Sequence, residues 1–104
     1  MELTHIDSSN FEETISGGNR VLVDFFATWC GPCKFMAPVL EDIAEELPEN
    51  QKIVKFDIDL GPEIAEKHLI TAVPTMIMFE NGQEIGRLIG VCSEDAILDL
   101  FAKA

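Results

Sequence analysis

Hydrophobic residues fall along this chain in two kinds of pattern. Three runs are almost continuously apolar and rich in β-branched or aromatic residues, at 21–26, 53–58 and 75–79. Such runs are typical of strands that are buried on both faces of a parallel sheet. Between them, apolar residues recur at three- and four-residue spacings, which predicts amphipathic helices. The alternation favours an α/β domain in which functional groups lie where strands lead into helices.

Four helices are expected, and polar or glycine residues mark their ends. Ser8, Ser9 and Asn10 can cap a short first helix, and Gly17 and Gly18 can end it. The expected helices are residues 11–15, about 33–47, 62–68 and a last helix that follows a cap at residues 93–96.

Pro38 stands inside the longest expected helix. An interior proline costs roughly 3 kcal/mol and kinks a helix. A helix that began at Pro38 would avoid this cost, but Ala37 is a poor N-cap. Because the apolar stripe continues on both sides of Pro38, we expect one kinked helix.

The end of the chain predicts a hairpin. Asn81-Gly82 is the strongest two-residue hairpin signal, and it joins the run at 75–79 to a strand at 84–89. Residues 4–7 are a weaker strand candidate. The complete order is βαβαβαββα, which predicts a three-layer α/β domain with a central mixed sheet of four to five strands.

Length and charge narrow the class of protein. The 104 residues leave room for one domain, residues 1–104. Seven Lys and Arg against nineteen Asp and Glu give a net charge of −12, so we expect no binding to nucleic acid or anionic membranes, which need basic surfaces. No apolar stretch approaches the roughly 20 residues of a membrane span. Residues 1–7 resemble no signal peptide, which favours a cytoplasmic protein.

The cysteines indicate the chemistry. Three cysteines are too few for a secreted disulfide scaffold, so a reducing compartment is expected. Cys30 and Cys33 lie directly after the first buried strand and at the start of a helix. Structural zinc needs four ligands, and the other candidates, Cys92, His5 and His68, are scattered. We therefore expect no metal and interpret the strand–CxxC–helix context as thiol–disulfide redox chemistry.

The start of a helix gives the two cysteines different roles. Free N–H groups and the macrodipole stabilise a thiolate there, and the thiolate is the form that attacks a disulfide. Cys30 is the expected nucleophile, and Cys33, one turn further in, is the expected resolving thiol. Their disulfide would close a small exchangeable ring worth only roughly 2 kcal/mol of chain entropy. Pro32 fits an early helical position and stiffens that ring.

Asp24 is a carboxylate inside an otherwise apolar strand. Burial disfavours the ionised form and raises the pKa of such a group. Asp24 could then accept the proton of Cys33, through water, when Cys33 attacks. Alternatively, Asp24 lies at a strand end and reaches solvent. The pattern alone leaves both interpretations open.

The segments around the cysteines resemble a known family. The matching segments are Trp29-Cys-Gly-Pro-Cys33 with Val23-Asp-Phe-Phe-Ala27 before it and Lys34, Met36 and Pro38 after it, then Phe56-Asp-Ile-Asp59, Val73-Pro-Thr75, Phe79-Glu-Asn-Gly82 and Gly90. Over essentially its whole length the chain resembles the thioredoxin family. This implies the thioredoxin fold, an α/β/α sandwich, and a protein-disulfide reductase that acts as a dithiol electron carrier.

The resemblance also implies the partners. Electrons would pass from NADPH through a separate thioredoxin reductase to Cys30 and Cys33, and then to disulfide-containing targets such as reductases and peroxidases. The chain has no Gly-rich dinucleotide motif, so it is expected to bind no cofactor itself. A monomer is expected.

Further site residues follow from the family pattern. Asp24 would be the proton acceptor, and Lys55 would lie near it and tune it. Pro74 would follow a cis peptide bond and face the dithiol, and Val73 would pair with the backbone of a bound substrate. The remaining residues of the docking surface would be Trp29, Gly31, Pro32, Gly90 and Val91.

The direction of the reaction follows from the residues between the cysteines. Family members that oxidise or isomerise disulfides usually carry a histidine there, which stabilises the thiolate. Gly31 and Pro32 lack that stabilisation, so a reductant is expected. Two alternatives remain: a redox-independent assembly or binding module, and an exported oxidant or isomerase.

Some residues depart from the family pattern. Phe26 stands where many members carry a second tryptophan, so an indole N–H is lost. Cys92 lies outside the motif and is expected to be buried and inert, the alternative being a reactive thiol near the groove. His5 and His68 are expected at the surface.

Overall fold

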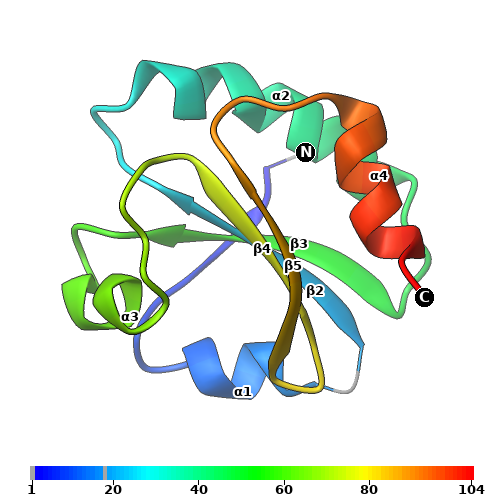
Figure 1. The fold of residues 1–104 in the computed structure, drawn as a ribbon, viewed down its shortest axis with the longest axis horizontal. Helices are drawn as coiled ribbons and strands as arrows, with labels where there is room; N and C mark the ends of the chain where they lie inside the picture. Colours follow the sequence, from blue (N-terminus) through cyan, green and yellow to red (C-terminus); the bar gives the residue numbers. More distant parts are fainter. Residues whose placement is uncertain (1, 18) are drawn as a thin grey trace.

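The computed structural model describes residues 2–17 and 19–104, and its elements follow the predicted order (Figure 1). They are β1 (Thr4–Ile6), α1 (Phe11–Ile15), β2 (Arg20–Phe26), α2 (Gly31–Glu45), β3 (Gln51–Asp57), α3 (Pro62–Lys67), β4 (Thr75–Glu80), β5 (Gln83–Ile89) and α4 (Glu94–Ala102). Gly18, which was expected to help end the first helix, lies outside the described residues.

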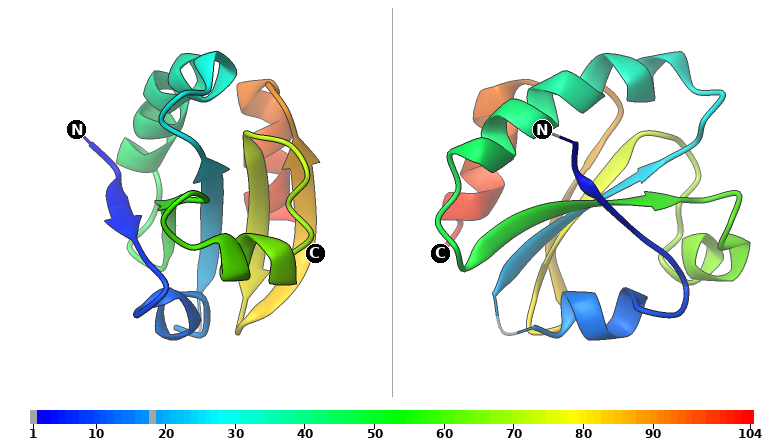
Figure 2. Two further views of the ribbon diagram at one scale, coloured as in Figure 1. Left: turned by 90° about the vertical axis from the view of Figure 1, so that its left-hand side faces the viewer. Right: turned by 180° about the vertical axis from the view of Figure 1, so that it is seen from behind.

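The five strands form one mixed sheet in the order β1-β3-β2-β4-β5. β1, β3 and β2 are parallel, whereas β4 runs antiparallel to β2 and β5 antiparallel to β4. Helices α1 and α3 lie on one face, and α2 and α4 lie on the other (Figures 1 and 2). The predicted three-layer α/β architecture is therefore confirmed, and β2 lies at its centre.

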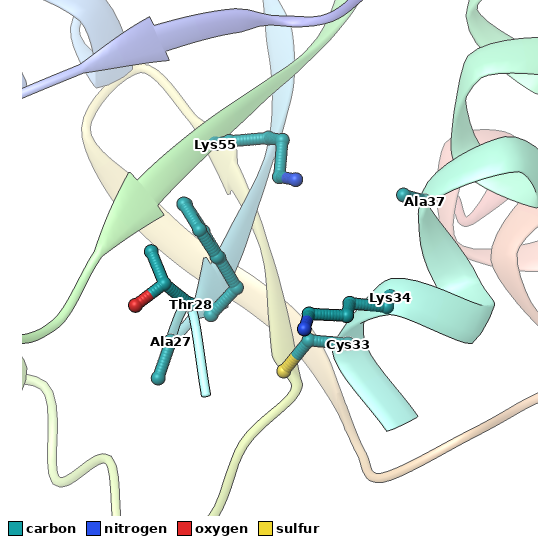
Figure 3. A pocket seen from close by; sticks show the side chains of 7 residues that line it. Ala27, Thr28, Cys33, Lys34, Ala37 and Lys55 are labelled. Carbon is teal, nitrogen blue, oxygen red and sulfur yellow. The ribbon is translucent and has the colours of Figure 1, made fainter. Parts of the chain in front are cut away.

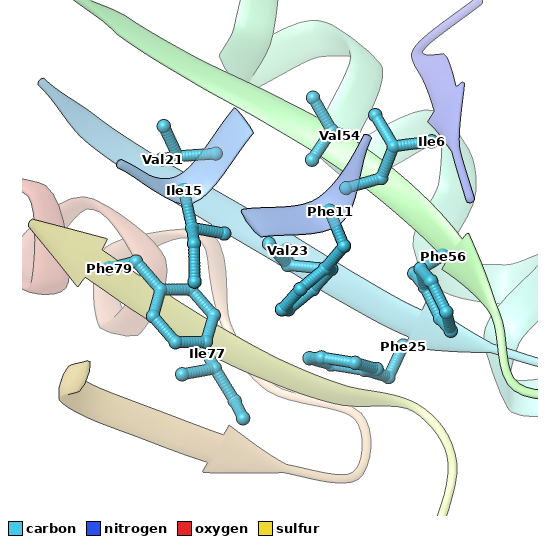
Figure 4. Close-up of a cluster of buried hydrophobic side chains, with 10 residues drawn as sticks. All are labelled: Ile6, Phe11, Ile15, Val21, Val23, Phe25, Val54, Phe56, Ile77 and Phe79. Carbon is cyan, nitrogen blue, oxygen red and sulfur yellow. The ribbon is translucent and has the colours of Figure 1, made fainter. Parts of the chain in front are cut away.

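Alternate residues of β2 divide the core between the two faces, because successive side chains in a strand point to opposite sides. Val21, Val23 and Phe25 belong to the cluster that also contains Phe11 of α1 (Figure 4). Leu22 belongs to the cluster formed with α2 and α4. By the same alternation, Asp24 faces the α2 side of the sheet.

His68 contradicts the expectation of a surface histidine. Its ring packs against Phe11, Phe25 and Phe79, with centroids 5.2, 6.2 and 5.4 Å apart. Its Nε2 atom is buried and has no hydrogen-bond partner among the described residues. This burial lowers the pKa of His68, because desolvation disfavours the charged imidazolium. His5 is exposed, as expected.

Helix α2 continues through Pro38 as a single helix, but it begins at Gly31 rather than near Cys33. Cys30 is the N-cap, so Gly31 and Pro32 occupy the first turn. Proline is tolerated there because its missing N–H has no intrahelical partner in any case. The loop from β2 therefore delivers the cysteines to a helix start. No helix in the described part of the chain is long and apolar enough to cross a membrane.

The hairpin at residues 81–82 and the N-cap of α4 follow the sequence signals, but the N-cap of α1 does not. Asn81 and Gly82 have φ values of 52° and 80°, as the predicted hairpin requires. The side chain of Ser93 accepts a hydrogen bond and caps α4, as expected. Asn10 is the N-cap of α1, but its side chain makes no cap hydrogen bond. Its Oδ1 instead accepts a bond from the N–H of Asp7 at 2.8 Å.

Helix α3 ends in a Schellman turn that has leucine where glycine is usual. The N–H of Leu69 donates to the oxygen of Glu66 at 3.0 Å, and the N–H of Ile70 donates to the oxygen of Ala65 at 2.9 Å. This motif requires a left-handed residue at its centre. Leu69 supplies it, with φ of 56°.

We expect Leu69→Gly to stabilise the protein. The left-handed conformation costs an L-residue about 1–2 kcal/mol, and the greater freedom of glycine in the unfolded chain offsets roughly 0.5–1 kcal/mol of that gain. Urea unfolding should therefore show a free energy of unfolding higher by about 0.5–1 kcal/mol. Leu98→Gly in helix α4 is the matched control and should destabilise by about 1 kcal/mol. An equal decrease in the free energy of unfolding in both variants would contradict this account.

Candidate active site

Cys30 and Cys33 lie together at the amino-terminal end of α2 and form a disulfide. The backbone N–H of Cys33 donates a hydrogen bond to Sγ of Cys30 at 3.1 Å. This N–H is one of the first-turn donors that no helical carbonyl can reach. The helix start therefore stabilises negative charge on Sγ of Cys30 in particular.

The two sulfurs differ in their surroundings although both residues are almost buried, with 4% of Cys30 and 2% of Cys33 exposed. Sγ of Cys30 accepts the N–H of Cys33 and lies 3.6 Å from the carbonyl oxygen of Val73. Cys33 lies one turn further in, between α2 and the end of β2, where it packs with Phe26 and Ala27. This asymmetry fits an attacking sulfur at Cys30 and a sheltered partner at Cys33.

Asp24 is fully buried in the middle of β2. The interpretation that it reaches solvent at a strand end is therefore wrong. It pairs in register with Lys55 on β3 and with Met76 on β4, and neither carboxylate oxygen accepts a hydrogen bond from any described residue. Burial raises the pKa of Asp24 to about 7, and the positive charge of Lys55 opposes part of that rise.

Lys55 lies beside Asp24 in the sheet but places its ammonium group over an aromatic ring. Its Nζ atom is 4.2 Å from the ring centroid of Phe26, which is within cation–π range. The His5 ring packs against the same phenylalanine in a T-shaped arrangement, with centroids 5.4 Å apart. The phenylalanine thus holds the lysine through its ring face, which needs no indole N–H.

A cavity of about 420 Å³ opens beside these residues (Figure 3). Figure 3 shows Lys55 entering it from β3 and Cys33 entering it from the first turn of α2. The space is large enough for several water molecules. The full lining is Phe26, Ala27, Thr28, Cys33, Lys34, Ala37 and Lys55.

Two loops complete the surface around the disulfide. The bond between Val73 and Pro74 is cis, as the family resemblance implies. The N–H of Gly90 donates to the oxygen of Pro74 at 2.8 Å, which joins the loop that carries Val91 to the cis-proline loop. Trp29 and Val91 are 68% and 53% exposed. The structure therefore brings the expected docking residues together around Cys30.

Asp59 is a site residue to which the sequence assigned no role. Its carboxylate accepts a hydrogen bond from Nε1 of Trp29 at 2.8 Å. The backbone N–H of Asp59 in turn donates to the side chain of Asp57 at 2.9 Å, and this fixes the turn after β3. The two aspartates at the end of this strand, Asp57 in its last position and Asp59 two residues later, were the available signal, since such side chains stabilise tight turns.

Cys92 is half-buried and takes no part in the disulfide. Burial raises the pKa of its thiol, and the nearby charge of Asp24 acts in the same direction. Because the thiolate is the reactive form, these effects favour the inert interpretation of Cys92. Among the described residues, no group of three or more His, Cys, Asp or Glu side chains is placed to hold a metal ion.

Comparisons with known proteins agree with this geometry. The family model described as Thioredoxin matches residues 2–103. The chain is 44% identical over 98 residues to a thioredoxin from Chlamydia trachomatis, which covers 94% of each protein. It is also 46% identical over 92 residues to a bifunctional thioredoxin reductase/thioredoxin from Mycobacterium leprae. That match covers 88% of this chain but spans only 20% of the bifunctional protein.

Solved structures show the same fold. Mitochondrial thioredoxin 3 from Saccharomyces cerevisiae, in its oxidised form, superposes with a TM-score of 0.86 at 34% identity, covering 98% of this chain and 95% of that one. A mutant thioredoxin from Halobacterium salinarum NRC-1 gives a TM-score of 0.87 at 32% identity, covering 96% of this chain and 88% of that one.

Asp24 makes stability depend on pH. A raised pKa means that the folded state holds the proton of Asp24 more tightly than the unfolded state does. The contribution of Asp24 to stability is therefore most favourable below pH 3.8 and falls as pH rises to about 7. The rise in the pKa of Asp24 corresponds to a loss of roughly 4 kcal/mol in the free energy of unfolding, at about 1.4 kcal/mol per tenfold change in proton affinity. Asp24→Asn removes the cost of burying an ionised carboxylate. The free energy of unfolding of this variant should therefore exceed that of the wild type by an amount that grows from pH 4 to pH 8.

Urea unfolding of the oxidised protein at several pH values tests this prediction. Exposed Asp99 on α4 offers a control with the same change in charge, and Asp99→Asn should stay within about 0.5 kcal/mol of the wild type throughout. A constant difference in the free energy of unfolding between Asp24→Asn and the wild type across this range would show that burial does not raise the pKa of Asp24.

Proposed function

Since the chain belongs to the thioredoxin family, we propose that its site works by attack of Cys30 on target disulfides, with electrons supplied by a separate thioredoxin reductase. Membership of the family makes the protein a thiol–disulfide oxidoreductase, a protein-disulfide reductase that carries electrons on a dithiol. The observation that best supports the proposed mechanism is the 3.1 Å hydrogen bond from the N–H of Cys33 to Sγ of Cys30. It supports the proposal that the start of α2 stabilises a thiolate on this sulfur.

The first step is attack by the Cys30 thiolate on one sulfur of the target disulfide. A bond forms between Sγ of Cys30 and that sulfur, the target S–S bond breaks, and the second target sulfur leaves as a thiolate that takes up a proton. The product is a mixed disulfide. The peptide N–H of Cys33 holds the charge on Cys30 before attack, as helix N-termini do for anions.

The second step is attack by Cys33 on Sγ of Cys30. Cys33 must first lose a proton, and Asp24 is the proposed acceptor, because its pKa of about 7 lets it take up or release a proton near neutral pH. The cavity that Cys33 and Lys55 line lies next to Lys55, the in-register neighbour of Asp24, and the proposal is that water passes the proton between them. The disulfide between Cys30 and Cys33 forms, the bond from Cys30 to the target breaks, and the target sulfur leaves as a thiolate that takes up a proton. The target has then gained two electrons.

The docking surface is proposed to bind an extended target segment. Val73 would pair with its backbone, and Pro74 would pack beside the reacting sulfurs. Gly31, Pro32 and Gly90 leave the backbone open to close approach, since they carry no large flexible side chain. Trp29 and Val91 would supply apolar contact.

The partners are proposed on the same basis. The relative from Mycobacterium leprae combines a thioredoxin reductase and a thioredoxin in one chain, which supports a reductase of that class as the electron donor. NADPH would then be bound by the reductase, and this chain would need no cofactor of its own. We place the protein in a reducing cytoplasm, as a monomer that acts on proteins with accessible disulfides, including reductases and peroxidases.

Cys33→Ser should accumulate mixed disulfides. Without the resolving thiol the first step proceeds and the second cannot, so targets remain bonded to Cys30. Non-reducing electrophoresis with insulin should show an adduct that dithiothreitol releases. Cys30→Ser is the control and should neither form the adduct nor reduce insulin. An adduct of equal yield with Cys30→Ser would assign the attack to Cys33.

The rate of the second step should follow the ionisation of Asp24. Asp24 accepts a proton only when ionised, so the rate should rise with pH through about 7. Asp24→Asn should lose that inflection and slow the step at neutral pH by up to about 10²-fold, the lower end of general base catalysis. Lys55→Met should move the inflection to higher pH, because removal of a positive charge raises the pKa of Asp24 further.

Stopped-flow measurement of mixed-disulfide resolution gives these rates directly. Lys52→Met serves as the control, since exposed Lys52 lies on the same strand as Lys55 and should leave the inflection in place. The same pH profile for Asp24→Asn and the wild type would overturn the proton-acceptor role.

A further inference from the structure

The cavity beside Cys33 also has the features of a binding site for a small molecule. Its volume of about 420 Å³ lies within the range of pockets that hold small organic ligands, roughly 300–1,000 Å³. It opens between the first two turns of α2 and strands β2 and β3 (Figure 3). Cys33, Lys34 and Ala37 line it from α2, because residues three and four positions apart share one face of a helix.

Two lysines direct their ammonium groups into this cavity. Figure 3 shows Lys34 entering from α2 and Lys55 entering from β3. Lys34 is exposed and Lys55 is half-buried, so Lys34 is the more accessible of the two. The chain has nineteen Asp and Glu, but no carboxylate from the described part of the chain lines the cavity.

These two lysines differ from most cations of the protein, which the protein itself satisfies. The satisfied cations are Arg20, Lys67 and Arg87, which pair with glutamates, and Lys103, which donates to the oxygen of Ile85. The others are Lys34, Lys52 and Lys55. None of these three forms an ion pair or hydrogen bond with a residue that the structure describes, and two of the three line one cavity.

Lys55 lies beside a carboxylate and yet does not bond to it. Asp24 is its in-register neighbour, but neither carboxylate oxygen of Asp24 accepts a hydrogen bond from a described residue. The Nζ atom of Lys55 instead lies 4.2 Å from the ring centroid of Phe26. An ammonium group has three N–H donors, and a half-buried donor without an acceptor costs free energy. An anion in the cavity would supply the acceptor that the protein does not.

The walls of the cavity select the kind of anion. Phe26, Ala27 and Ala37 present apolar surface, which gains free energy by contact with a hydrocarbon body. Lys34 and Lys55 favour an acidic group. An inorganic ion would meet the second condition but not the first. A carboxylate on a short apolar body meets both.

We propose that this cavity is a regulatory site for a small organic carboxylate. The acidic group binds Lys34 and Lys55, and the apolar body packs against Phe26 and Ala37. The bound anion displaces water from the cavity and neutralises the charge of Lys55, so it slows the attack of Cys33 on the mixed disulfide. This effect on the rate, but not the binding itself, rests on the proposed function.

Benzoate is a suitable probe, and benzamide is a neutral control of the same shape. A titration of the oxidised protein, followed by NMR of the backbone amides, should give a dissociation constant for benzoate on the order of 1 mM. Benzamide should bind at least about tenfold more weakly, because it forms no charge-assisted bonds with the lysines. The amides that shift should be those of residues 26–28, 33–37 and 55, which surround the cavity. Equal binding of benzamide, or shifts away from these residues, would refute the site.

Variants locate the binding more closely. Lys34→Met and Lys55→Met should each weaken benzoate binding by about tenfold. Lys52→Met is the matched control, since exposed Lys52 lies on β3 but does not line the cavity, and it should keep the wild-type affinity. Ala37→Leu retains both cations but fills the space, so it should abolish binding.

Circular dichroism establishes that each variant is folded, and exposed Lys34→Met keeps the test open if Ala37→Leu or Lys55→Met is not. Wild-type affinity in both Lys34→Met and Lys55→Met would refute the proposal. A loss in Lys52→Met equal to theirs would also refute it, because the attraction would then come from the charge of the whole protein.

Stopped-flow measurement of the two chemical steps tests the regulatory effect. Saturating benzoate should slow resolution of the mixed disulfide near neutral pH by up to about 10²-fold, the limit set by loss of the general base. The first attack by Cys30 should keep its rate, and benzamide at the same concentration and ionic strength should change neither step. An unchanged rate of resolution with benzoate bound would overturn the regulatory role.

The outcomes separate this proposal from the reductase function. If the protein reduces insulin but does not bind benzoate, the site is refuted and the reductase function stands. If benzoate binds in the cavity but the protein does not reduce insulin, the reductase function fails and the binding site stands without its regulatory role.

Discussion

The chemistry proposed for this protein depends on one hydrogen bond, from the N–H of Cys33 to Sγ of Cys30. It exists because the loop after β2 ends at Cys30 and α2 begins at the next residue, so the free N–H of Cys33 in the first turn points at this sulfur. A thiol has an ordinary pKa of about 8.5, and a helix start lowers it. The rest of the fold, with β2 buried at the centre of five strands, keeps this junction in place.

Burial of Asp24 adds a second constraint of opposite character. The helix start stabilises an anion on Cys30, whereas the core destabilises the anion of Asp24 and raises its pKa to about 7. In the proposed mechanism, the first effect prepares the attacking sulfur, and the second keeps a proton acceptor available for the resolving sulfur. Both effects act on the same face of β2. Asp24 and Phe26 point to the side of the sheet that carries α2, and Phe26 packs with the two cysteines.

The main features of the fold could be predicted because each rests on local pattern. Buried strands, the Asn81-Gly82 hairpin and the cap at Ser93 all follow from neighbouring residues. The start of α2 could not be placed correctly, because Gly31 is a poor helix former whose inclusion depends on the tertiary position of Cys30 as N-cap. His68 was misplaced because a single histidine in a short helix carries no signal of the phenylalanine cluster that surrounds it. The bond between Asp59 and Trp29 joins residues thirty positions apart, and the left-handed Leu69 depends on how α3 ends.

Alkylation of the reduced protein at a series of pH values, followed by mass spectrometry of each cysteine, tests the central claim most directly. The account predicts that Cys30 reacts as a thiolate at a pH clearly below the ordinary thiol pKa of about 8.5, while Cys33 becomes reactive only at higher pH. If both sulfurs titrate together near that ordinary value, the helix start does not stabilise Cys30, and the proposed order of attack is wrong.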